Sequence, residues 1–276
     1  GILANAQTLE VNLVMTSNSV SLPAVLLDGN GFSYQITQNG ALQPERNPSY
    51  YYDEFYTAND LTVTVNGSDY TLDSVPAGLS EVGGRQIVVE DSDVGGLKVT
   101  RKTYVPREGY FARSLDIFEN PTGQPVNFST SLFFDEPRTV YYFTTTSGDD
   151  TFTTGDCWFI SDDNEDDDAF LNWYDPPFLM LLDGRGGATQ ISRAQRSGAD
   201  AYYGWRGSVA PGERVIFMYI VSPGVHRTSL NAARERLDGA TPPPEILAGL
   251  TSQEISQIRN WSLPADGQSP IAPLPL

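Results

Sequence analysis

The sequence predicts a mainly β fold, an antiparallel β-sandwich with a short helical segment near the C-terminus. Apolar and polar residues alternate through most of residues 8–221, as they do in strands with one buried face. Turn residues interrupt this alternation at short intervals, which is typical of packed antiparallel sheets. Hydrophobic residues make up 39% of the 276 residues, which is enough to form a substantial core.

The first expected hairpin joins a strand at 61–65 to a strand at 70–72. Asn66 and Gly67 lie between them, and this dipeptide tolerates the positive φ angles of a tight hairpin turn. Later strands are separated by turns rich in Pro and Gly, which preset or permit the required φ angles. We expect these strands at 97–105, 110–119, 126–134, 140–146, 151–154, 157–161, 178–182 and 215–221.

Helical periodicity begins near residue 226. A helix is expected over 229–237, where apolar residues recur at helical spacing before the stop signal Asp238-Gly239. Thr251 and Glu254 have the spacing of a capping box, which predicts a second short helix.

These patterns divide the chain into a sandwich body at 1–225, a helical appendix at 226–262 that packs on the same domain, and a Pro-rich linker at 263–276. Four prolines without periodicity in the last stretch indicate a linker, so we expect covalently linked neighbouring domains.

Charge and composition exclude several classes of function. The net charge of −18 argues against nucleic acid as a partner, because phosphate-backbone binding needs a basic surface. No apolar run is long enough for membrane insertion as a helix. One Cys and one His exclude an internal disulfide and any mechanism that needs two imidazoles.

The kind of charge predicts an extracellular or cell-surface location. Only Lys98 and Lys102 are lysines among the 17 cationic residues, whereas carboxylates are abundant. Many hydrated carboxylates suit a surface bathed in salt, where screening removes most of their mutual repulsion.

Two stretches resemble a known family. Residues 99–106 and 111–117, followed by the N-P-T sequence at 120–122, are similar to a strand–strand unit of galactose-mutarotase-like β-supersandwich domains. The P-G-E sequence at 211–213 before the apolar strand is similar to another part of those domains. The resemblance implies a supersandwich and the setting of secreted bacterial carbohydrate-active or surface proteins.

The family's chemistry does not follow from this resemblance. Mutarotases of this kind use paired imidazoles with a carboxylate, whereas this chain has only His226, outside the matched stretches. The resemblance therefore implies an architecture and a sugar-rich setting, since a fold does not by itself confer a function.

The most acidic segment is 162–168, with the sequence DDNEDDD. In an extended loop, alternate side chains would project oxygen atoms to one side, as calcium requires. The candidate calcium ligands are Asp162, Asn164, Asp166 and Asp168. A solvated acidic loop, kept extended by repulsion between like charges, explains the same pattern.

Aromatic clusters beside acidic residues suggest carbohydrate binding, because sugars stack on aromatic rings while polar groups bind their hydroxyls. The candidate carbohydrate-binding residues are Tyr51, Trp173, Tyr174 and Tyr203. A sandwich core also consumes aromatic residues, so some members of each cluster are expected inside.

The sequence thus predicts a non-enzymatic extracellular module for carbohydrate or surface attachment, or for spacing, within a larger secreted or cell-surface protein. Calcium in the acidic segment would make it more rigid. Two alternatives stay open: a carboxylate-dependent glycoside hydrolase, which needs one protonated and one ionised acid, and a structural module that assembles with copies of itself.

Overall fold

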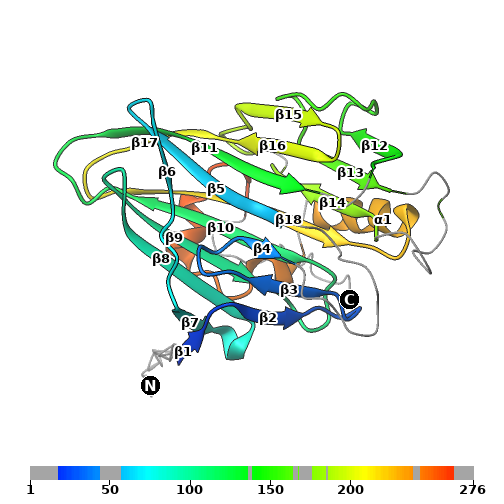
Figure 1. Cartoon of the computed structure of the whole chain (residues 1–276), viewed down its shortest axis with the longest axis horizontal. Helices are drawn as coiled ribbons and strands as arrows, with labels where there is room; N and C mark the ends of the chain where they lie inside the picture. The colour runs from blue at the N-terminus through cyan, green and yellow to red at the C-terminus, as the bar shows by residue number, and fades with distance from the viewer. Residues whose placement is uncertain are drawn as a thin grey trace, which may run out of the picture.

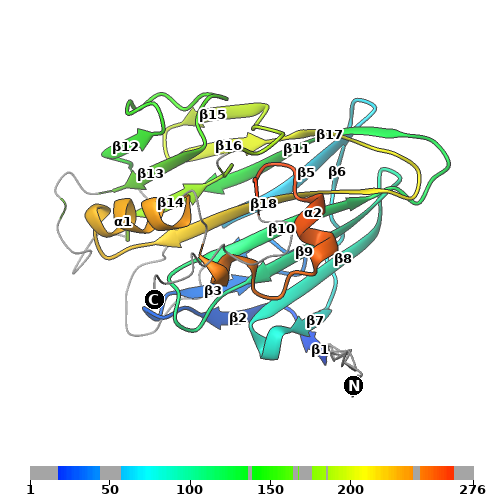
Figure 2. The same ribbon diagram turned by 180° about the vertical axis from the view of Figure 1, so that it is seen from behind.

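Two antiparallel sheets, A and B, pack face to face, and a layer of short helices covers the outer side of sheet A (Figures 1 and 2). The computed structural model describes residues 18–43, 57–135, 139–163, 167, 176–184, 186–238 and 243–263. The predicted antiparallel sandwich with a short C-terminal helical segment is confirmed.

Sheet A has nine strands. In spatial order they are β1 (Asn18–Ser21), β7 (Ala77–Glu81), β8 (Gln86–Val94), β9 (Leu97–Tyr104), β10 (Ala112–Glu119), β18 (Arg214–Pro223), β14 (Phe178–Leu181), β13 (Trp158–Asp162) and β12 (Tyr142–Thr145).

Sheet B also has nine strands and faces the viewer in Figure 1. Its main order is β15 (Arg193–Ser197), β16 (Asp200–Gly204), β11 (Val126–Asp135), β5 (Thr57–Val65), β4 (Leu42–Gln43), β3 (Ser33–Ile36) and β2 (Ala24–Leu27). Two further strands complete it: β17 (Arg206–Val209) pairs with β11, and β6 (Ser68–Thr71) pairs with β5.

The helices lie against sheet A on the side away from sheet B (Figure 2). They are α1 (Arg227–Leu237), the 3-10 turn η2 (Pro244–Leu247) and α2 (Ser252–Gln257), and a further 3-10 turn, η1 (Val82–Gly84), follows β7. Thr251 and Glu254 cap α2 reciprocally, as predicted. No helix in the described ranges is long and apolar enough to cross a membrane.

Strand β18 explains why the molecule has two cores. Phe217 and Tyr219 point into the core between the sheets, whereas Ile216 and Met218 point into the core beneath the helices. Because the strand is buried on both faces, it reads in the sequence as a continuous apolar run.

The C-terminal segment also completes sheet A. Asn260 is fully buried; its side chain accepts a bond from the Met218 N–H (2.9 Å) and donates to the carbonyls of Met218 and Leu182 (2.7 Å each). The backbone N–H of Arg259 donates to the Ile216 carbonyl. This segment therefore provides hydrogen-bond partners for the backbone of β18 at residues 216 and 218, where β14 does not pair with it.

One predicted strand is wrong. Residues 151–154 form an irregular turn, because Asp156 accepts bonds from the backbone N–H groups of Thr153 and Ser147 and from the Thr153 hydroxyl. A carboxylate that satisfies local backbone donors offers the chain an alternative to strand pairing. The short strands β1 to β4 and the pairs β7–β8 and β15–β16 were not predicted from the sequence.

Candidate functional site

The outer face of sheet B carries two rows of side chains that cross several strands. In the first row, Gln195 lies opposite Tyr202, Tyr202 opposite Phe133, and Phe133 opposite Asp60. Their inward-pointing neighbours in the same strands, such as Leu132 and Ala201, are buried in the core. This alternation directs the whole row away from the core.

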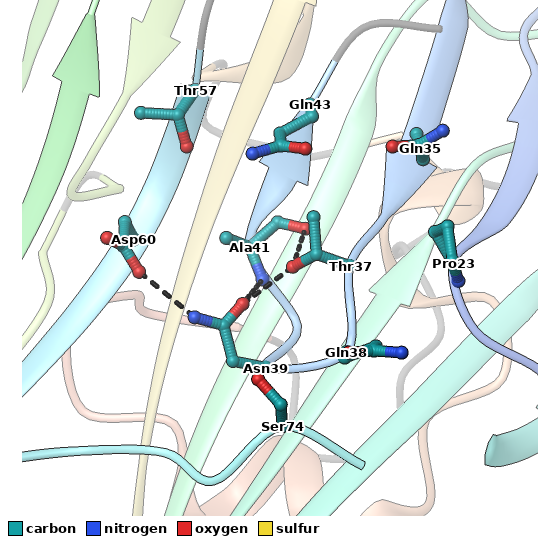
Figure 3. Close-up of a pocket in the computed structure, with 10 residues that line it drawn as sticks. All are labelled: Pro23, Gln35, Thr37, Gln38, Asn39, Ala41, Gln43, Thr57, Asp60 and Ser74. Carbon is teal, nitrogen blue, oxygen red and sulfur yellow. Dashed lines mark hydrogen bonds between the residues drawn. The ribbon is translucent and has the colours of Figure 1, made fainter. Parts of the chain in front are cut away.

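The second row runs parallel to the first. Asp200 lies opposite Asp135, and Asp135 opposite Thr57. On the next strands, Gln43 lies opposite Gln35, and Figure 3 shows Thr57, Gln43 and Gln35 side by side. Neighbouring strands lie about 4.8 Å apart, so the two rows span a length suited to a chain-like ligand.

An aromatic stack stands in the first row. The rings of Phe133 and Tyr202 lie with centroids 4.9 Å apart and an interplanar angle of 27°. The guanidinium of Arg193 lies over the Tyr202 ring at 5.4 Å. Since β16 lies between β15 and β11, Arg193 and Phe133 flank Tyr202 on opposite sides, and Phe133 is the end of the stack nearest β5.

A pocket of about 420 Å³ is lined in part by Asp60 of β5 (Figure 3), the residue opposite Phe133. Most of its lining groups are amides and hydroxyls. The residues that line it are Pro23, Gln35, Thr37, Gln38, Asn39, Ala41, Gln43, Thr57, Asp60 and Ser74. Asp60 belongs both to the pocket and to the row that holds the aromatic stack.

Hydrogen bonds fix the centre of the pocket. Asn39 donates from Nδ2 to Asp60 Oδ1 at 3.2 Å. The Thr37 hydroxyl donates to Asn39 Oδ1 at 2.6 Å, and the Ala41 N–H donates to the same oxygen at 3.3 Å. The orientation of the Asn39 amide is therefore determined, with its nitrogen toward Asp60 (Figure 3).

The second row includes a pair of facing carboxyl groups. Burial raises the pKa of Asp135, and so do the negative charge of Asp200 and a hydrogen bond between the two carboxyl groups. Glycoside hydrolysis needs two carboxyl groups at least about 5 Å apart, so that a sugar or a water molecule fits between them. Two carboxyl groups joined by a hydrogen bond are too close for that role.

These features together suit the binding of a polyhydroxylated ligand. The exposed side of an aromatic stack can pack against an apolar ring face, while amide, hydroxyl and carboxylate groups exchange hydrogen bonds with hydroxyls. Within the described ranges, no group of three or more His, Cys, Asp or Glu residues is arranged to hold a metal ion.

The structure places only some of the predicted binding residues. Tyr203 is fully buried between the sheets, where its hydroxyl donates to Asn59 Oδ1 at 2.5 Å and its ring packs edge-on against Trp205 and Tyr219. Its ring is therefore packed inside the protein and is not presented to solvent. The other three, Tyr51, Trp173 and Tyr174, lie outside the described residues.

The predicted calcium ligands are placed only at the start of the acidic segment. Asp162 is buried at the end of β13, and its Oδ2 lies 3.3 Å from Nε of Arg227. Asn164, Asp166 and Asp168 lie outside the described residues.

Another acid of that segment, Asp167, caps helix α1. It accepts hydrogen bonds from the backbone N–H groups of Arg227 and Thr228, at 2.6 and 3.2 Å, and from the Thr228 hydroxyl. These bonds satisfy donors at the helix N-terminus and lower the pKa of Asp167, although burial acts against this. Two acids of the segment, Asp162 and Asp167, therefore contact the first residues of α1.

The residues of the outer face of sheet B were not predicted from the sequence. A signal for Phe133 was present: within the predicted strand 126–134, alternation that turns Phe128 and Phe134 inward turns Phe133 outward. No such signal marked Tyr202 as its partner, because the pairing of β11 with β16 is set by the tertiary fold. Asn39 and the glutamines lie in segments without a chemical motif.

No family model and no curated protein matches the sequence. Solved structures that resemble the chain include a GH36 alpha-galactosidase from Geobacillus stearothermophilus, 13% identical, with a TM-score of 0.41 over 76% of this chain and 41% of that one. A polysaccharide lyase is 11% identical, with a TM-score of 0.39 over 78% and 34%. A galactose mutarotase related enzyme from Lactobacillus acidophilus is 9% identical, with a TM-score of 0.34 over 76% and 97%.

The chain spans about a third to two fifths of the length of the first two of these proteins. The galactose-mutarotase-like resemblance expected from the sequence recurs among the similar structures. Since the identities and TM-scores are low, these similarities carry no functional argument, and the function of the chain is inferred from the side chains of sheet B.

Proposed function

We propose that this chain is a non-enzymatic, extracellular module that binds neutral glycans through the outer face of sheet B. The observation that carries the proposal is the Phe133–Tyr202 stack beside an amide- and hydroxyl-lined pocket, with Asp60 common to both. An apolar surface for ring faces lies next to groups that bind hydroxyls, and sugars require both.

The charges of this face favour an uncharged ligand. The carboxylates of Asp60, Asp135 and Asp200 belong to the two rows, and the guanidinium of Arg193 beside them is stacked on Tyr202. The whole chain carries a net charge of −18. Repulsion would therefore weaken the binding of uronate-containing or sulfated polymers.

Three finer parts of the proposal come from the sequence. The extracellular or cell-surface location rests on the acidic, lysine-poor composition. Attachment within a larger protein rests on the Pro-rich stretch 263–276, and calcium binding rests on the spacing of oxygen ligands in 162–168. Each is independent of the glycan-binding face.

The hydrolase alternative has a specific weakness on this face. On this face Asp135 and Asp200 lie directly opposite each other, and a hydrogen bond between their carboxyl groups leaves no room for a sugar or a water molecule between them. We therefore assign these acids to hydroxyl binding and not to hydrolysis.

The proposal is tested with immobilised neutral polysaccharides, with uronate-containing and sulfated polysaccharides as charge controls. We expect saturable binding to at least one neutral glycan without the release of reducing ends. Release of reducing ends would instead support the hydrolase. Binding restricted to acidic polymers, or chains of protomers in light scattering without any glycan bound, would contradict the proposal.

A further inference from the structure

Arg101 lies directly behind the pocket, between the two sheets, with an exposure of 3%. Its Nη2 donates to the backbone carbonyl of Asn59 at 2.7 Å, and its Nη1 donates to the backbone carbonyl of Asn39 at 3.3 Å. Asn59 directly precedes Asp60, and Asn39 is the residue that holds Asp60 by a hydrogen bond. One buried guanidinium thus contacts the backbone on both sides of the hydrogen bond between Asn39 and Asp60.

We propose that Arg101 is the positioning residue of the sheet B pocket: it sets the separation of Asn39 and Asp60 from behind, without touching the ligand. This inference rests on the proposed function, because it explains how the binding face keeps its shape. Arg101 belongs to β9 of sheet A, whereas the ligand would bind on the outer face of sheet B.

The backbone on both sides needs such support. Asn59 has a φ of +62°, in the left-handed region that non-glycine residues rarely adopt, and it is the extra residue where the register of β5 and β11 shifts. Such a conformation persists only where its surroundings enforce it. The Asn59 side chain accepts a bond from the Tyr203 hydroxyl at 2.5 Å, which fixes the bulge from a second direction.

The other side of the pocket depends on a glycine. Gly40 has a φ of +78°, and a Cβ at this position would lie 3.0 Å from Cδ of Arg101. The turn that carries Asn39 can therefore approach the arginine only because residue 40 lacks a side chain. The pocket wall and the stem of Arg101 are packed directly against each other.

Sheet A compensates the buried charge of Arg101. Asp116 accepts from Nε at 2.8 Å, and the Tyr219 hydroxyl accepts from Nη2 at 3.0 Å and donates to Asp116 Oδ2 at 2.9 Å. Burial acts against the charged guanidinium, but Asp116 and Tyr219 outweigh it and raise the pKa of Arg101 above its ordinary value. Arg101 therefore stays charged, and the planar fork of its guanidinium reaches both backbone carbonyls.

The test compares Arg101→Lys with Arg113→Lys. Arg113 is a matched control, because it is also fully buried and donates to two backbone carbonyls, those of Ile246 and Ala248, but on the helix side of sheet A. A lysine keeps the charge but has no planar fork to span two carbonyls. We expect Arg101→Lys to weaken neutral-glycan affinity at least tenfold, and Arg113→Lys to lower the melting temperature with affinity unchanged.

Amide hydrogen exchange provides a readout that needs no ligand. The N–H of Gly40 donates to the Thr37 carbonyl, and that of Ala41 donates to Asn39 Oδ1. We expect both to exchange faster in Arg101→Lys and not in Arg113→Lys. If Arg101→Lys does not fold, the double variant Arg101→Met with Asp116→Leu removes both charges of the pair and takes its place.

Two failures are distinguishable. If the wild-type chain binds a neutral glycan and the folded Arg101 variant binds it equally well with unchanged exchange, the positioning role is wrong and the proposed function stands. If the wild-type chain binds no glycan, the proposed function fails, and unchanged exchange at Gly40 and Ala41 would still overturn the positioning role.

Discussion

Trp205 and Asp183 join the two sheets through a buried hydrogen bond, in which the indole N–H donates to Asp183 Oδ1 at 2.8 Å. Trp205 lies between β16 and β17 of sheet B, and Asp183 follows β14 of sheet A. The other carboxylate oxygen accepts from the Ile191 N–H at 2.7 Å. Burial raises the pKa of Asp183 to about 6, although these hydrogen bonds act against the rise.

A pH dependence of stability follows from this pKa. Because the folded-state pKa of Asp183 lies above its unfolded value, the folded state binds the proton more tightly, and ionisation opposes folding. The stability that the protonated Asp183 contributes to the folded state is fully present below about pH 4 and is lost as the pH rises through about 6. We expect the difference in unfolding free energy between Asp183→Asn and the wild-type protein to shift by roughly 3 kcal/mol in favour of the variant over this range.

Urea unfolding at several pH values measures this difference, and the Trp205 environment provides a fluorescence signal. Subtracting the unfolding free energy of the wild-type protein from that of the variant removes the effect of the many other carboxylates, because both proteins share them. A difference that stays constant from pH 4 to pH 7 would show that Asp183 does not titrate as its burial implies.

The aromatic stack yields a prediction about affinity. Replacing Phe133 or Tyr202 with alanine removes half of the stacked surface, and we expect neutral-glycan affinity to fall about tenfold, which is about 1.4 kcal/mol. Tyr141→Ala is the control, because Tyr141 is 61% exposed but precedes β12, an edge strand of sheet A. Isothermal titration measures all three, and equal losses in all would contradict a specific role for the stack.

Asn260 is expected to determine much of the stability of the C-terminal segment. Asn260→Ala would leave the buried Met218 N–H and the Leu182 carbonyl without their partner, and each unsatisfied group costs about 1–3 kcal/mol. We therefore expect the free energy of unfolding to fall by about 3 kcal/mol. Asn231→Ala, which removes one helix-surface bond to the Arg227 carbonyl, should lower stability far less in the same chemical denaturation.

Calcium binding by the acidic segment is tested by titration. If 162–168 binds calcium, isothermal titration shows heat, the melting temperature rises, and Asp166→Asn weakens both effects because it removes a charged oxygen ligand. Asp150→Asn removes a carboxylate of a different acidic turn and should leave both unchanged. Absence of heat together with an unchanged melting temperature would assign the segment to solvation and helix capping.

Much of the fold could be predicted, because local chemistry determines it. Asn66 and Gly67 form the hairpin turn expected of them, with φ angles of 52° and 80°. The cap at Thr251 and the alternation in β11 follow from local spacing. What could not be predicted is register between distant strands, such as Tyr202 opposite Phe133, because the sequence does not specify which strands become neighbours.

The same limit explains why Tyr203 was predicted to bind sugar and Tyr202 was not. Adjacent residues in a strand point to opposite faces, and which face is buried depends on the sheet packed against it. Here sheet A covers the side of Tyr203. Likewise, the role of Arg101 arises from two backbone segments that the sequence places about 42 and 62 residues away.

Occupancy of the outer face of sheet B by a neutral glycan can be followed residue by residue. Its most direct test is an NMR titration of the isotope-labelled chain with the neutral glycan that binds best on the polysaccharide panel. We expect amide shift changes confined to Asn39, Asp60, Phe133, Tyr202 and their neighbours. Changes confined to the helical layer on the far side of sheet A, or to the edge strands β1 and β12, would contradict it.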